Sequence, residues 1–101
     1  MDKITGLLHL ANKAGKLALG QTRILESIKR KKPALIIVAN DAGHAIKRKL
    51  ARSEFIEIGM NSEELGFIFG RVKVSLAAIL DIHLAKEIRK SIESSGLLKT
   101  V

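Results

Sequence analysis

One run of six apolar residues constrains the fold of this chain more than any other feature. Residues 34–39, Ala-Leu-Ile-Ile-Val-Ala, follow Pro33 and end at the polar pair Asn40-Asp41. A continuous apolar run between turn signals is typical of a strand that helices cover on both faces. The sequence therefore predicts an α/β fold with this strand inside a sandwich.

The segment before this strand predicts a short strand, a glycine turn and a basic helix. Residues 17–19, Leu-Ala-Leu, form the short strand, and Gly20 forms the turn out of it. The helix is expected from residue 21 to about residue 31. The cations at its end suit the negative end of the helix dipole, and Pro33 prevents the helix from continuing. Its buried side is expected to hold Ile24, Leu25 and Ile28.

Four further helices are indicated by apolar residues at helical spacing and by capping residues. We expect Asp2 to cap the first helix, which stops near Gly15, whereas Asp41 caps the third and Asp81 the last. The fourth, Ser62–Phe69, follows a capping-box pattern formed by Asn61 and Glu64. The residues expected on the buried sides of the first, third and last helices are Ile4, Leu7, Leu8 and Ala11; Ala42, Ala45, Ile46 and Leu50; and Ile82, Ala85, Ile88 and Ile92.

Two more strands are expected at residues 55–58 and 74–80, so helices and buried strands alternate along the chain. The economical architecture is a single α/β domain spanning residues 1–101. We expect a three-layer α/β/α sandwich with a small, mixed, four-stranded central sheet and about five helices. Phe55 and Phe67 are expected in its core.

Positive charge is concentrated in the first half of the chain. Residues 13–52 contain eleven Lys or Arg and two acids, whereas residues 53–101 contain six cations and seven acids. This asymmetry favours a face that binds a polyanion over a solvated, lysine-rich exterior. We expect a cytoplasmic protein that does not enter a membrane, because no apolar run spans a bilayer and no signal-peptide core or cysteine is present.

Patterns for catalysis or metal binding are absent from the sequence. His9, His44 and His83 each stand without a second ligand at i+3 or i+4, and no serine lies in a nucleophile-elbow pattern. Asp41 and Asp81 follow apolar strands, where a phosphate-handling enzyme could hold a divalent metal ion. Each also stands directly before a helix, which favours a capping role. We therefore expect no enzyme activity, no metal and no cofactor.

The turn at Gly20 is the main candidate for a binding site, and the loop near Gly70 is the second. A helix start that follows a glycine can present free backbone N–H groups to a phosphate, although a turn glycine can also serve the backbone alone. With three Phe, no Tyr and no Trp, a base-stacking platform is not expected, which leaves recognition of RNA shape by backbone, short polar side chains and charge. The donors and cations expected around the turn are Gln21, Thr22, Arg23, Lys16, Lys29 and Lys32.

The order and spacing of these segments resemble the ribosomal L-seven-Ae/L-thirty-e family, most closely its bacterial YlxQ-type branch. The resemblance covers residues 7–92 and implies a three-layer α/β/α sandwich that binds structured RNA, a kink-turn or a related internal loop. It is carried, in this order, by Gly20, the basic helix after it, residues 33–41, residues 55–58, Glu64-Leu65-Gly66, Gly70 and Asp81.

The resemblance implies RNA contacts from the turn that opens the second helix and from the loop before the last strand. The implied role of Val72 is apolar packing against an extruded base. The chain departs from the kink-turn signature at Thr22-Arg23 and Glu26, where strong binders carry Asn-Glu and a lysine. This departure bears on kink-turn specificity rather than on RNA binding. The positions of this chain that match the implied contacts are Gly20, Gln21, Thr22, Arg23, Glu26, Arg71, Val72 and Lys73.

The sequence thus predicts a non-enzymatic, monomeric protein that binds structured RNA. Ribosomal RNA and other components of a ribonucleoprotein are candidate partners. One alternative is a protein-interaction module on the same fold with only weak, non-specific RNA affinity. Another is a small phosphate-handling enzyme that uses Asp41 and Asp81.

Overall fold

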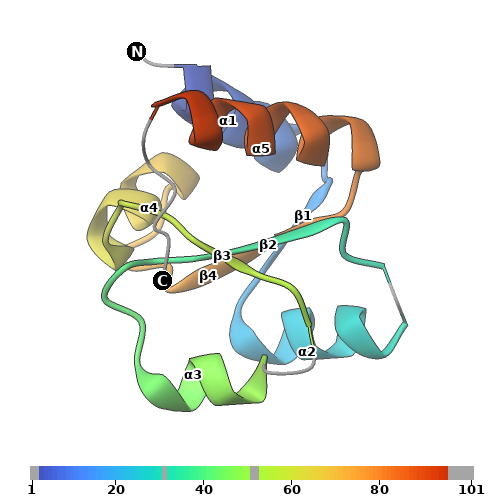
Figure 1. Ribbon diagram of the computed structural model, residues 1–101, viewed down its shortest axis with the longest axis vertical. Coiled ribbons are helices and arrows are strands. Elements are labelled where there is room, and N and C mark those ends of the chain that lie inside the picture. The colour runs from blue at the N-terminus through green and yellow to red at the C-terminus, as the bar shows by residue number, and fades with distance from the viewer. Residues whose placement is uncertain (1–2, 31, 51–52, 96–101) are drawn as a thin grey trace.

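The computed structural model describes residues 3–30, 32–50 and 53–95. Within these ranges five helices and four strands alternate, and the helices lie on both faces of one sheet (Figure 1). This confirms the predicted α/β sandwich. The helices are α1 Lys3–Lys13, α2 Gln21–Lys29, α3 His44–Lys49, α4 Ser62–Phe69 and α5 Ile82–Ser95. The strands are β1 Leu17–Leu19, β2 Leu35–Val38, β3 Ile56–Glu57 and β4 Leu76–Ile79.

The sheet is mixed, with the strand order β1-β4-β2-β3. Strand β4 runs antiparallel to both β1 and β2, whereas β3 runs parallel to β2. Leu19 pairs with Ala77 and Val38 pairs with Leu76, so the ends of β1 and β2 lie beside the beginning of β4. The turn at Gly20 and the loop before β4 are therefore at the same end of the sheet.

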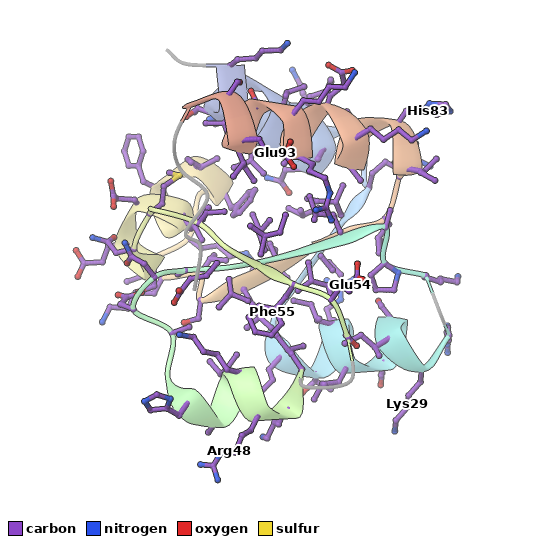
Figure 2. The ribbon with its side chains drawn as sticks, in the orientation of Figure 1. Lys29, Arg48, Glu54, Phe55, His83 and Glu93 are labelled. Atoms are coloured by element: carbon purple, nitrogen blue, oxygen red, sulfur yellow. The ribbon has the colours of Figure 1, made fainter. Side chains whose placement is uncertain are left out.

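Two apolar clusters fill the spaces on either side of the sheet. Leu35 and Ile37 of β2 join the cluster under α1, α4 and α5, and Ile36 and Val38 join the cluster over α2 and α3. Alternate residues of a strand point to opposite faces, so a strand buried on both sides must be apolar throughout. Phe55 packs against the second cluster, as expected of a core residue (Figure 2).

Several helix caps and helix ends form where the sequence predicts them. Helix α4 begins with a complete capping box, in which the Glu64 N–H donates to Asn61 Oδ1 (2.8 Å) and the Asn61 N–H donates to Glu64 Oε1 (2.9 Å). The carboxylate of Asp81 caps α5 by accepting from the Leu84 N–H (2.9 Å). Helix α1 stops before Gly15, which has a positive φ. The expected cap at Asp2 lies outside the described residues.

Two expectations about buried side chains outside α3 are wrong. Phe67 is 87% exposed because α4 packs through Leu65, Ile68 and Phe69, which leaves Phe67 on the opposite side. Ile82 is 59% exposed because it lies in the first turn of α5, at the rim of the layer, where neighbouring His83 points outward (Figure 2).

Helix α3 differs most from its prediction. It begins at His44 after Gly43, and none of its residues, including Ala45, is buried. Asp41 does not cap it, because its carboxylate accepts hydrogen bonds from Ser62 at the start of α4 instead. Leu50, just beyond α3, is buried as expected. None of the helices in the described ranges is long and apolar enough to cross a membrane.

Candidate nucleic-acid interface

A hollow of about 280 Å³ lies where the start of α2 meets the loop that leads into β4. We call it the first hollow. The pairing of β1 with β4 creates it, because this pairing brings two segments that are distant in sequence to one end of the sheet. Its lining contains two cations and no carboxylate, and this charge favours the binding of an anion. The lining residues are Leu19, Gly20, Gln21, Ile46, Arg71, Lys73, Val74, Ser75 and Leu76.

Gly20 lies in the lining of this hollow and has a backbone conformation that favours glycine. Its φ is +89°, a region that side chains disfavour, although a Cβ would meet no atom within 4 Å. The requirement for glycine is thus conformational rather than steric. Among the described residues, no side-chain hydrogen bond caps the start of α2 at Gly20. The N–H groups of its first turn can therefore be offered to an anion.

A second hollow of about 250 Å³ runs between α2 and the outer edge of β1. Arg23, Glu26 and Arg30 line it because residues at i, i+3 and i+7 share one side of a helix. Lys32 adds a further cation, so the charged lining is three cations and one acid. This second hollow is the more mixed of the two in charge.

The structure divides the predicted site residues among these places. Gly20, Gln21, Arg71 and Lys73 line the first hollow, and Arg23, Glu26 and Lys32 line the second. The other four line neither hollow. Val72 lies between two residues of the first hollow and is 88% exposed, and Lys29 points away from the end of α2 (Figure 2). The predicted residues outside both hollows are Lys16, Thr22, Lys29 and Val72.

Several lining residues were not among the predicted site residues, and Arg30, Ile46 and Ser75 are examples. Arg30 shares a helix side with Arg23, a spacing that could have identified it from the sequence. Ile46 and Ser75 line the first hollow through tertiary packing of α3 and the approach to β4, and no local pattern in the sequence signals this.

The cations of α3 are not equally available to bind a ligand. Lys47 Nζ lies 2.7 Å from Glu57 Oε1 in a part-buried ion pair that joins α3 to β3. Arg48 is exposed and points away from the sheet (Figure 2). Of these two cations, Arg48 is therefore the one available to a polyanion.

Asp41 and Asp81 lie at opposite ends of the sheet, because each follows a strand and these two strands are antiparallel. They cannot bind one metal ion together, which argues against the phosphate-handling enzyme. The described residues also contain no group of three or more His, Cys, Asp or Glu able to hold a metal ion.

Both carboxyl groups have structural partners that lower their pKa. For Asp41, desolvation raises the pKa, but hydrogen bonds from Ser62 and the charge of Lys73 outweigh it and hold the pKa below the ordinary 3.8. The hydrogen bond from the Leu84 N–H is the main cause that lowers the pKa of Asp81. Lys16 lies near enough to Asp81 to lower it further.

Comparisons with known proteins agree with this architecture. The RNA-binding protein YlxQ of Enterococcus faecium is 29% identical over 97 residues, which cover 91% of this chain and 93% of that protein. A protein with unknown function from Bacillus halodurans has a TM-score of 0.82 at 22% identity, over 92% of this chain and 99% of that chain. The Giardia lamblia 15.5kD RNA binding protein has a TM-score of 0.67 at 20% identity, over 89% of this chain and 84% of that chain.

The two solved structures have a fold similar to that of this chain. A family model built from sequences matches a stretch that includes both hollows. The model that describes the Ribosomal protein L7Ae/L30e/S12e/Gadd45 family matches residues 2–92. This stretch includes the turn at Gly20, the capped helix α4 and the loop before β4. The chain belongs to the ribosomal protein L7Ae/L30e/S12e/Gadd45 family.

Proposed function

We propose that this protein binds structured RNA and catalyses no reaction. The observation that carries the proposal is the first hollow, where an uncapped helix start, Arg71 and Lys73 converge. Backbone N–H groups at a helix start and cationic side chains are two of the kinds of donor that proteins offer to phosphate oxygens.

The loop beside the first hollow adds an apolar contact. Val72 exposes 88% of its surface between Arg71 and Lys73. Single-stranded loops and bulges of RNA offer unstacked bases that apolar and aromatic groups can cover. An exposed valine between two phosphate-binding cations suits an RNA that displays such a base.

The names of relatives support RNA as the class of ligand. The Enterococcus faecium relative and the Giardia lamblia structure are both named as RNA-binding proteins. The second hollow supports the same class, since Arg23, Arg30 and Lys32 extend the cationic surface along α2.

We further propose that the preferred RNA is a kink-turn or a related internal loop. The family resemblance supports this choice, and the Thr22-Arg23 sequence in place of Asn-Glu makes it the point to test. Arg23 and Glu26 line the same hollow. An RNA lying there would therefore meet a cation where kink-turn binders present an acid.

The experiment is a titration of the protein against a kink-turn hairpin and a plain duplex of equal length, at low and near-physiological salt. Preference for the kink-turn that persists at the higher salt is the expected result. Equal affinities that collapse with salt would contradict kink-turn recognition, because counterion release then supplies all the binding. Absence of binding to both RNAs at low salt would contradict RNA binding itself.

A protein-interaction module is the second candidate function, and Phe67 is the observation that favours it. Phe67 exposes 87% of its surface on α4, and aromatic side chains are enriched in protein–protein interfaces. Weak, sequence-blind RNA affinity in the titration, together with a specific protein partner, would favour this candidate over the first.

A further inference from the structure

The loop that carries Arg71, Val72 and Lys73 takes its shape from helix α4. The Arg71 N–H donates to the Gly66 carbonyl (2.7 Å), and the Val74 N–H donates to the Ser62 carbonyl (2.9 Å). A Cβ on Gly66 would lie 2.7 Å from the carbonyl oxygens of Arg71 and Val72, so the loop packs directly on the helix backbone. Both ends of the loop are thus held by α4.

Helix α4 is in turn fixed to the end of β2 by Asp41. Asp41 Oδ1 accepts from the Ser62 N–H (2.9 Å), and Asp41 Oδ2 accepts from Ser62 Oγ (2.9 Å). Ser62 is only 6% exposed, and the neighbouring Asn40 N–H donates to the Met60 carbonyl (2.9 Å). A continuous chain of hydrogen bonds therefore runs from the sheet through Asp41 and Ser62 to Val74.

Capping of α4 explains only one of the two contacts of Asp41, because Oδ2 accepts from the Ser62 hydroxyl rather than from a backbone N–H. The helix already has a complete capping box made by Asn61 and Glu64. Both oxygens of Asp41 nevertheless bind Ser62, the residue whose carbonyl holds Val74. The two bonds to Ser62 therefore secure the position of the loop as well as the start of the helix.

We propose that Asp41 is a positioning residue for RNA binding, acting through Ser62 to hold the loop with Arg71, Val72 and Lys73 in its binding conformation. The inference rests on the proposed function of that loop. Ordering a loop before binding lowers the entropy lost on association, so a preorganised loop binds more tightly. Asp41 itself does not line either hollow.

Charge and positioning predict opposite effects when Asp41 is removed. Asp41 lies close enough to Lys73 for their charges to interact. Loss of this carboxylate would, by charge alone, strengthen binding of a polyanion. Loss of a positioning contact would weaken it. The sign of the change in affinity therefore separates the two roles.

The test compares Asp41→Ala with Asp81→Ala in titrations against the kink-turn hairpin and the plain duplex described above. Asp81 is a matched control, because it also accepts from a helix N–H and lies near a lysine, but at the other end of the sheet. We expect Asp41→Ala to bind RNA about tenfold more weakly, whereas Asp81→Ala binds as tightly as wild type or slightly more tightly. Ser62→Ala, which removes one hydrogen bond without changing charge, should show a smaller loss in the same direction.

Amide hydrogen exchange in the free protein supplies the second readout. Exchange at Val74 should be faster in Asp41→Ala and Ser62→Ala, while Asp81→Ala should affect Leu84 and leave Val74 unchanged. The inference would be overturned if Asp41→Ala left the exchange protection of Val74 unchanged or bound RNA more tightly than wild type. If Asp41→Ala does not fold, the same two measurements on Ser62→Ala decide the question. Failure of wild type to bind any structured RNA would instead refute the proposed function, and the exchange of Val74 would still decide whether Asp41 holds the loop.

Discussion

At the scale of single residues, helix geometry separates side chains that are neighbours in the sequence. Gln21 lines the first hollow, whereas Arg23 lines the second. Two residues along a helix differ in direction by about 200°, so both cannot face one surface. The donors at the start of α2 thus serve two surfaces. An RNA that contacts both must wrap around the first turn of the helix.

Substitution of Arg23 tests whether the second hollow contacts RNA. Arg23→Ala should weaken binding and reduce the slope of log affinity against log salt by about one, as expected for one lost phosphate contact. The measurement is a titration at several salt concentrations. Lys86→Ala is the control, since Lys86 is exposed on α5, across the sheet from α2, and should leave the slope unchanged. An unchanged slope in Arg23→Ala would exclude Arg23 as a phosphate contact.

At the scale of elements, close packing between α4 and the loop after it requires a residue without a Cβ. We expect Gly66→Ala to lower the free energy of unfolding by about 1–3 kcal/mol, because its Cβ would meet two backbone carbonyls at 2.7 Å. Gly6→Ala is the matched control, a helical glycine with nothing within 4 Å of its Cβ position. It should raise that free energy by about 0.5–1 kcal/mol, because alanine favours helix. Urea denaturation measures both, and equal effects would contradict the packing argument.

Neighbouring cations of α3 should have different roles. Lys47→Met should lower the free energy of unfolding by about 1 kcal/mol, because it breaks the part-buried pair with Glu57. Arg48→Met should change it by less than about 0.5 kcal/mol, as is usual for an exposed side chain. Thermal or urea unfolding of the two variants checks the difference. Similar stabilities would mean that the ion pair does not hold α3 to β3.

At the scale of the whole molecule, strand direction decides which carboxylates can act together. The antiparallel pairing of β2 with β4 sends Asp41 and Asp81 to opposite ends of the sheet. Each therefore serves its own helix, Asp41 through Ser62 and Asp81 through Leu84. Because both carboxyl groups have lowered pKa values, together they make the stability of the fold depend on pH.

Acid should destabilise the fold through these two groups. Both pKa values in the folded state lie below 3.8, the value expected in the unfolded chain. The stability they contribute is fully present above pH 3.8 and is lost as the pH falls through the folded values. We expect the melting temperature of wild type to fall as the pH drops below 3.8, and that of Asp41→Asn/Asp81→Asn to fall less. Parallel curves for the two proteins would show that other groups cause the acid sensitivity.

The sequence by itself determined the order and kind of the elements, because each signal is local. The apolar run at residues 34–39 predicts a doubly covered strand, the pair Asn61 and Glu64 predicts a capped helix, and Gly20 predicts a turn. The side of α2 that carries Arg23 and Arg30 also follows from spacing alone.

Only the tertiary structure decided which of these elements meet. Pairing of β1 with β4 joins Gly20 to Lys73 in one hollow, and Asp41 binds Ser62 rather than capping α3. The exposure of Phe67 also depends on which side of α4 packs against the core. Contacts between distant segments depend on the register and direction of strands, and no window of neighbouring residues encodes them.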